Sequence, residues 1–245
     1  FPNGLANSSG LVGRNLMFHP CGYVVGTFED EQDGHRGSQN WLCSQQFYET
    51  DPGHGFVRGY TLEASRGSGP VLTALGGMMS GKIPFGAGHH EAFRKSFNRT
   101  AGLIVLCEDL PEEANTVTLD PELKDANGIP APRIDYRMSD NSLRMLEHGR
   151  QRATEAMRAA GAHEVQHTIP IPSGGWHLMG TARMGRDPAR SVVNEWGRSH
   201  DVKNLFIIDG SIFVTAGAVN PTPTIQALAL YIADAMKQRL ANLFD

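Results

Sequence analysis

The sequence predicts an α/β (α+β) protein, in which an antiparallel or mixed sheet precedes a strand–loop–helix unit. Three observations predict it. Short segments rich in β-formers follow one another between residues 22 and 137, with few helical crossovers, as antiparallel pairing requires. Residues 139–160 then read as the longest helix. Beyond residue 204, a short apolar run is followed by a segment with a clean helical stripe.

The predicted strands rest on two kinds of sequence evidence, alternation of apolar residues and β-forming composition. In residues 56–64, Phe56, Tyr60 and Leu62 share one parity, which indicates a half-buried strand. The remaining strands are indicated by β-forming composition between turn residues, and they are 22–28, 41–48, 102–109, 115–119 and 133–137. A short helix is predicted for 89–98, and residues 1–20 read as a loop with short extended pieces.

The two long helices have defined apolar faces. The helix over 139–160 ends at Gly161 as its C-terminal cap, and its face comprises Leu143, Leu146, Ala153, Met157 and Ala160. Residues 204–210, "NLFIIDG", are typical of a buried strand. The last helix has Thr222 as N-cap and Pro223 in its first turn, and its stripe comprises Ile225, Leu228, Ala229, Ile232, Met236 and Leu240.

Composition excludes several classes of protein. The net charge of −4 and the scattered Lys and Arg residues argue against a nucleic-acid partner. No apolar run approaches the roughly 20 residues that span a bilayer. Cys21, Cys43 and Cys107 form no CxxC pair and are expected to be free thiols, one or two of them buried. The opening "FPNGLANSSG" lacks an initiator Met and a signal sequence, which predicts a processed product or a piece of a longer protein. Periplasmic and cytoplasmic locations are both compatible with it.

Three C-terminal features could act on one ligand. His177 can take and release a proton near neutral pH. Asn220 can donate and accept hydrogen bonds without changing charge. The helix N-terminus at Thr222 and Pro223 favours negative charge. A base, an amide and an anion-stabilising helix end suit removal of a hydride from an alcohol. Taken singly, however, each fits a structural role: a packed histidine, a turn asparagine and a core helix.

In order and together, these segments resemble the glucose–methanol–choline (GMC) flavoprotein oxidoreductases. The resemblance is carried by "WHLMGTARMG" and "VVNEWGRSHDVKNLFIIDGSIFVTAGAVNPTPTIQALALYIADAM", and also by "GLVGRNLMFHP" and "LDPELKDANGIPAPRIDYRMSDNS". It covers nearly the whole chain, most specifically residues 174–236. Within the family, the chain looks most like bacterial sugar- and polyol-oxidising enzymes of the gluconate 2-dehydrogenase large-subunit type.

The resemblance implies FAD as cofactor and a role for each matched residue. His177, in the pattern His-x-x-Gly-Thr, would be the catalytic base, and Asn220 would hold the substrate oxygen. Asp209 and Gly210 would contact the pyrophosphate and ribityl part of FAD. Asn220, Pro221 and Thr222 would form the turn at the pyrimidine edge of the flavin. Trp176 would line the cavity beside the base, where glycines let the backbone approach a flat cofactor.

One departure from the family pattern concerns the GxGxxG unit that grips the ADP half of FAD, which this sequence does not contain. The expected division is therefore residues 1–20 as a segment of the FAD domain or linker, 21–173 as the substrate-binding sheet domain, and 174–245 as the C-terminal part of the FAD domain. On this interpretation the isolated chain binds FAD poorly and turns over little.

The leading function is FAD-dependent oxidation of a CH–OH group in a sugar or polyol. The alternative is a non-catalytic ligand-binding or interaction module that has lost its cofactor site. A third hypothesis, a metal-dependent hydrolase using His89, His90 and His177, has no HExxH or CxxC spacing to support it. The residues do not distinguish oxygen from a quinone or a cytochrome partner as electron acceptor, nor do they specify the substrate or the oligomeric state.

Overall fold

The computed structural model describes residues 4–38, 40–171 and 174–238, and these form two compact units. The sheet unit consists of Pro20–Cys107 and Asp140–Gly174. The loop unit consists of Phe1–His19, Glu108–Ser139 and Gly175–Asp245. Compared with the expected three-part division, residues 108–139 group with the two chain ends rather than with the sheet. Which unit binds substrate and which binds cofactor remains a prediction.

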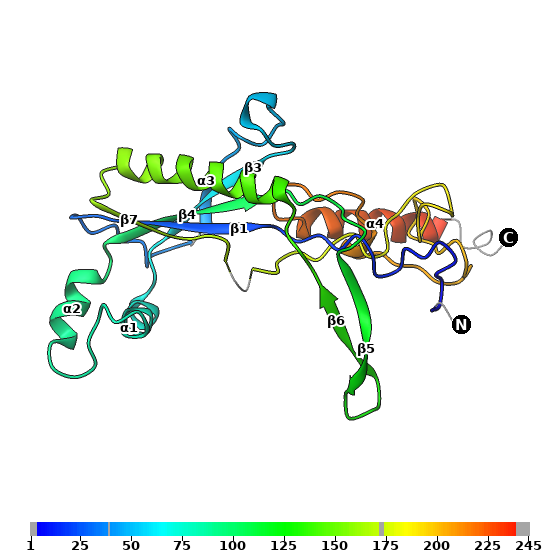
Figure 1. The fold of residues 1–245 in the computed structure, drawn as a ribbon, viewed down its shortest axis with the longest axis horizontal. Coiled ribbons are helices and arrows are strands. Elements are labelled where there is room, and N and C mark those ends of the chain that lie inside the picture. Colours follow the sequence, from blue (N-terminus) through cyan, green and yellow to red (C-terminus); the bar gives the residue numbers. More distant parts are fainter. Residues whose placement is uncertain (1–3, 39, 172–173, 239–245) are drawn as a thin grey trace. The chain divides into compact units, whose positions relative to one another are not determined.

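The sheet unit is built on five strands, β1 (Cys21–Thr27), β2 (Asn40–Ser44), β3 (Tyr60–Arg66), β4 (Thr100–Cys107) and β7 (Glu164–Thr168). Their order is β2-β3-β4-β1-β7, and every neighbouring pair is antiparallel (Figure 1). The prediction of an antiparallel sheet is therefore confirmed. Strand β7 has no counterpart in the sequence prediction, because only Val165 is half-buried there and the rest of its short polar run is exposed.

Helix α3 (Asp140–Ala159) lies along one face of this sheet and contacts β1, β3, β4 and β7 (Figure 1). The helix comes very close to the strands, since a methyl group on Gly149 would overlap the side chain of Val105 on β4. The predicted bounds, 139–160, agree with the observed ones within one residue at each end. Gly161 has a φ of 96°, the left-handed conformation expected of a C-terminal cap. The buried residues of the helix are Ser142, Met145, Leu146, Gly149, Ala153 and Met157.

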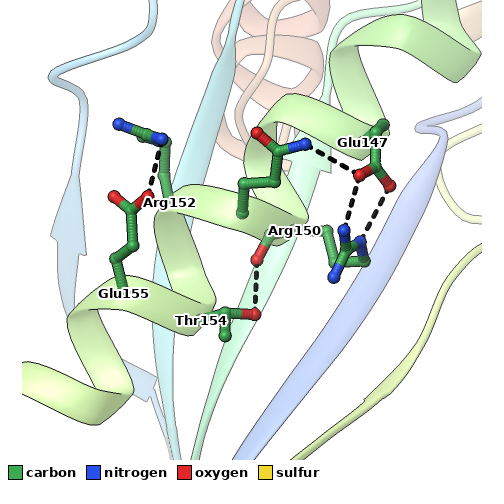
Figure 2. A network of polar contacts seen from close by, with 6 residues as sticks. Glu147, Arg150, Arg152, Thr154 and Glu155 are labelled. Atoms are coloured by element: carbon green, nitrogen blue, oxygen red, sulfur yellow. Dashed lines mark hydrogen bonds and ion pairs between the residues drawn. The ribbon is translucent and has the colours of Figure 1, made fainter.

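Two members of the predicted α3 face were wrong. Leu143 is 46% exposed, and Ala160 is also exposed. The contact runs along Met145, Gly149 and Ala153, so Leu143 falls to its solvent side. Figure 2 shows a network of polar contacts along α3, in which Glu147 is bonded to Arg150 and Arg152 is bonded to Glu155.

Two predicted strands of the sheet unit were too long at one end. β2 stops at Ser44 because the chain turns at residues 45–48, where the amide of Tyr48 donates to the carbonyl of Gln45. β3 begins at Tyr60 because Phe56 lies in a loop with a 3-10 helix, η1 (Pro52–His54), followed by Gly55 at a φ of 74°. Tyr60 and Leu62 are buried, as the alternation predicted.

Two helices complete the sheet unit. α2 (His89–Ser96) confirms the predicted short helix. α1 (Pro70–Met79) was missed by the sequence prediction. It has no buried residue and contains two glycines, so its sequence shows neither an amphipathic stripe nor strong helix propensity.

The loop unit contains fewer regular elements. Strands β5 (Thr116–Lys124) and β6 (Pro130–Asp135) form an antiparallel hairpin, and η2 (Gly210–Ile212) precedes helix α4 (Thr222–Gln238) (Figure 1). Isolated bridges, including Arg14 with Thr116 and Met17 with Met179, provide the extended pieces predicted for residues 1–20.

The buried strand predicted for residues 204–210 was wrong. Within the described residues, this segment pairs through a single bridge, between Phe206 and Arg198. A strand needs a neighbour that supplies a ladder of hydrogen bonds, and one bridge does not make a ladder. Its apolar side chains still pack: Ile207 lies against a buried cluster that includes Val193, Ile212 and Ile232.

Helix α4 confirms the predicted C-terminal helix with one boundary shifted. Thr222 is its first helical residue rather than its N-cap, and the carbonyl of Pro221 accepts the first hydrogen bond, 2.9 Å from the amide of Ile225. Of the predicted stripe, Ile232 is buried, and Ile225, Leu228, Ala229 and Met236 are half-buried. Leu240 lies outside the described residues.

Two further predictions concern the whole chain. In the described part of the chain Cys21, Cys43 and Cys107 form no disulfide, as expected, and Cys21 and Cys107 are buried while Cys43 is exposed. Among the helices of the described residues, none combines the length and the apolar character that a membrane crossing needs.

Candidate active site

His177 lies in a bulge between two backbone pairs. Met17 and Met179 exchange both of their backbone hydrogen bonds, at 2.9 and 3.1 Å. Two residues further along, a regular antiparallel register would pair His19 with His177. The amide of His19 donates instead to the carbonyl of Trp176, at 3.2 Å, so this stretch contains one extra residue. His177 takes a left-handed conformation, with a φ of 60°.

This conformation is unusual for a residue with a side chain. It costs about 1–2 kcal/mol relative to a right-handed one, although histidine tolerates it better than most residues. It persists because the hydrogen bonds of Met17 and His19 fix the backbone on both sides of the bulge. Strain at a chemically active side chain is typical of functional sites.

The environment of the imidazole favours its neutral form. His177 is half-buried, and burial lowers the pKa of its side chain below the ordinary histidine value. Its Nδ1 atom is buried and has no hydrogen-bond partner among the described residues. Its ring lies edge-on to that of His19, with ring centroids 4.9 Å apart and an interplanar angle of 77°. At neutral pH the group is therefore a base ready to accept a proton.

Gly210 connects the segment of His177 with the last helix. A methyl group on Gly210 would lie 2.7 Å from the carbonyl oxygen of Leu178 and 3.3 Å from Cδ1 of Ile225 in α4. The residue next to His177, the predicted Asp209–Gly210 pair and the first turns of α4 therefore lie in contact. Asp209 is exposed and caps η2, since its carboxylate accepts from the amide of Ser211 at 2.8 Å.

The turn before α4 presents the other predicted residues. Asn220 and Thr222 are exposed, and Pro221 is buried. Pro223 and Thr224 are exposed as well, so the N-terminal end of a 17-residue helix is open to a ligand. Gly210 lies next to both Ile225, in the first turn after this one, and Leu178, the neighbour of His177. That the side chains of His177 and Asn220 converge on one substrate stays a prediction.

Sequence reasoning missed His19. This residue is fully buried, and over the described part of the chain its ring is the one in contact with that of His177. Its position in "NLMFHP", within a stretch read as loop, gave no periodic signal. Trp176, expected to line the cavity beside the base, is 45% exposed.

The sheet unit contains two cavities apart from the predicted site residues, and the described residues offer no metal site. Two cavities of about 530 and 650 Å³ lie in the sheet unit and share Leu42, Ala64 and Leu103, and neither is lined by a predicted site residue. Over the part of the chain that the structure describes, no group of three or more His, Cys, Asp or Glu side chains is arranged to hold a metal ion.

Comparison with known proteins identifies the class. Residues 111–229 match the C-terminal model of the GMC oxidoreductases. The chain is 41% identical to 2-methyl-1,2-propanediol dehydrogenase of Mycolicibacterium austroafricanum over 247 aligned residues, which cover 100% of the chain and 45% of that protein. It is 32% identical to the fructose dehydrogenase large subunit of Gluconobacter japonicus, covering 96% of the chain and 42% of the relative. The chain thus spans less than half the length of these curated relatives.

Solved structures show the same fold. Formate oxidase of Aspergillus oryzae RIB40, described in connection with FAD modification, aligns with a TM-score of 0.60 and 15% identity, over 96% of this chain and 48% of the other. Pyridoxine 4-oxidase from Mesorbium loti aligns with a TM-score of 0.55 and 18% identity, over 93% and 44%. These likenesses show the fold alone. The family model and the curated relatives show that the chain belongs to the GMC oxidoreductase family, for which FAD is the supported cofactor.

Proposed function

We propose that the protein containing this chain oxidises a CH–OH group of a small alcohol or polyol, with FAD as cofactor and His177 as catalytic base. The observation that carries the proposal is the setting of His177. It is a half-buried imidazole with a lowered pKa, held in a left-handed bulge by backbone bonds on both sides. A merely structural histidine does not need this strained backbone conformation.

The chemistry assigned to the chain's own residues is proton removal and alignment. Neutral His177 takes the hydroxyl proton of the substrate, which raises the tendency of the adjacent carbon to release hydride. The amide of Asn220 holds the substrate oxygen through a hydrogen bond without adding charge. FAD, when bound, supplies the hydride acceptor.

The residues assigned to FAD have properties that fit it. Gly210 is buried, and the Leu178 carbonyl lies where its side chain would be, so a glycine here lets the Asp209–Gly210 segment pack directly against the segment of His177. The turn Asn220–Thr222 leads into a long helix whose first residues are exposed, and the positive end of its dipole favours a flavin that gains negative charge. Asp209 offers an exposed carboxylate to hydroxyl groups. We assign Asp209, Gly210, Asn220, Pro221 and Thr222 to FAD.

The substrate class follows from the relatives. The names of the two dehydrogenases indicate a small vicinal diol and a ketose sugar, and gluconate 2-dehydrogenase flavoprotein of Pantoea cypripedii is 33% identical over 51% of the chain. We propose a polyol or a small diol as substrate. Because these relatives are named dehydrogenases, we propose an acceptor other than oxygen, either a quinone or a cytochrome. Anaerobic turnover with a soluble quinone, compared with oxygen uptake, tests this choice.

The decisive experiment is anaerobic stopped-flow reduction of the flavin in the full-length, FAD-loaded protein with 1,2-propanediol and fructose as substrates. His177→Ala should slow reduction by about 10²–10⁴-fold, because that is the usual contribution of a general base. In the wild type the rate should fall on the acid side of a pKa that lies below 6.5, the ordinary value for histidine.

His90→Ala provides the control, since His90 is exposed on α2 and its loss should leave the rate unchanged. Flavin reduction at the wild-type rate in His177→Ala would reject the base role. A protein that retains FAD but reduces it with none of these alcohols would favour the non-catalytic alternative.

A further inference from the structure

His19 makes the one ring contact that the structure gives to the imidazole of His177. The two rings meet edge to face, with centroids 4.9 Å apart at 77°. This is a preferred arrangement for planar rings, because the positive edge of one meets the electron-rich face of the other. His19 is itself fully buried, so it is packed behind the proposed base and does not reach solvent.

A ring contact matters here because a hydrogen bond is missing. A catalytic imidazole is normally oriented by an acceptor on its second nitrogen, which fixes both the ring and the tautomer. Nδ1 of His177 is buried without such a partner in the described part of the chain. The orientation of the ring therefore depends on what packs against it.

The backbone makes His19 a firm support. Its amide donates to Trp176, directly before His177, while Met17 is paired in both directions with Met179. Phe18 lies between these two residues. Its backbone amide donates a hydrogen bond to the carboxylate of Asp109 at 3.2 Å, and its ring meets that of Tyr136 edge-on, with ring centroids 4.8 Å apart. The position of the His19 ring is thus fixed relative to the bulge.

We propose that His19 is a positioning residue, which holds the imidazole of His177 in the orientation that takes the substrate proton. This inference rests on the proposed function, because it gives His19 a role only if His177 is the base. His19 acts through His177 and does not itself exchange a proton with the substrate.

The test compares three substitutions of His19 in the full-length, FAD-loaded protein. His19→Phe keeps a planar ring of similar size, His19→Leu fills much of the volume without a flat ring, and His19→Ala empties it. We expect flavin reduction by 1,2-propanediol to be within about threefold of the wild type in His19→Phe, and slowed about 10–100-fold in the other two, a loss within the range of a general-base contribution. The concentration of substrate at half-saturation should change little.

A second readout does not depend on activity. In the 245-residue chain itself, NMR titration of histidine-labelled protein, with His177→Ala used for assignment, reports the pKa of His177. Removing the buried ring in His19→Ala admits water, so the pKa should rise toward its ordinary value, and His19→Phe should leave it low. Burial lowers the present pKa of His177, and among the described residues His19 is the titratable ring in contact with it.

The outcomes separate the two proposals. If His177→Ala reduces flavin slowly while all three His19 variants match the wild type, the positioning role is overturned and the base role stands. If His177→Ala is unimpaired, the proposed function itself fails. Should His19→Ala lose FAD or unfold, the pair His19→Phe and His19→Leu decides, and equal rates in that pair would overturn the inference.

Discussion

The sheet unit and the loop unit provide hydrogen-bond partners for their backbone groups in different ways. In the sheet unit, continuous antiparallel ladders pair five strands, and α3 covers one face. In the loop unit, side chains often replace a ladder. Asn115 donates to the carbonyl of Arg137 and accepts from its amide, and Asn194 accepts from the amides of Trp196 and Arg198. The proposed active site lies in the unit that is built this way.

The difference suggests where each unit is sensitive. A regular sheet tolerates small changes in backbone dihedral angles, but the side chains between the sheet and the helix on it must fit closely. Irregular loops held by single bonds require particular backbone conformations at particular residues. Substitutions at glycine distinguish the two requirements, because the same added methyl group probes conformation in one unit and packing in the other.

The largest effect is expected at Gly180 in the loop unit. Gly180 has a φ of 95°, and a methyl group there would overlap the backbone carbonyl of Asn15. Gly180→Ala should lower the free energy of unfolding by at least about 2 kcal/mol, measured by urea denaturation, because left-handed strain and a backbone clash add. Gly10→Ala is the matched control: its φ is 70°, but nothing lies within 4 Å, so about 1 kcal/mol is expected. Equal losses would show that backbone crowding is unimportant in this unit.

A somewhat smaller loss is expected at Gly149 in the sheet unit. Gly149→Ala would push α3 away from Val105, and overpacking of this kind costs about 1–3 kcal/mol. Gly76 lies inside α1 with open space around it, so Gly76→Ala should instead raise the free energy of unfolding by about 0.5–1 kcal/mol. Thermal unfolding of both variants gives the comparison, and a stabilised Gly149→Ala would contradict the close packing of helix and sheet.

The smallest effect is expected on the exposed side of α3 (Figure 2). Glu147 accepts hydrogen bonds from Arg150 and Gln151, which lower the pKa of its carboxyl to about 2. Since the Glu147 side chain is 52% exposed, Glu147→Gln should lower the free energy of unfolding by no more than about 0.5 kcal/mol at pH 7.

The pH dependence of this effect has a definite sign. When folding lowers the pKa of a carboxyl group, the group stabilises the protein fully at a pH above its pKa in the unfolded chain. This stabilisation is lost as the pH falls to the pKa of the group in the folded protein. The difference between wild type and Glu147→Gln should therefore shrink between about pH 4.5 and 2.

The same contrast explains what the sequence could predict. Strands β1 and β4 are rich in β-forming residues and helix α3 has an apolar helical stripe, and their predicted bounds agree with the structure within a few residues. The segment 204–210 is equally apolar, yet it forms no strand, because pairing depends on a neighbour that local sequence does not reveal. The exposure of Leu143 similarly depends on the exact line of contact between α3 and the sheet.

The site was predictable only in part. His177 and Asn220 were singled out by the chemistry of their side chains, and the family resemblance added the Asp209–Gly210 pair and a role for each residue. These roles remain predictions. Spacing along the chain could not predict that His19 packs on His177, because they belong to segments far apart in sequence. The bulge at His177 depends on a register between two irregular segments, and no composition signal encodes it.

The order of the segments along the chain affects when the site can form during translation. The loop unit is assembled from three separate stretches, and the whole sheet unit is synthesised between His19 and Gly175. Domains generally fold as they emerge from the ribosome. The sheet unit can therefore fold before the segment of His177 has been synthesised, and the proposed active site can form only after that segment has joined the segment of His19.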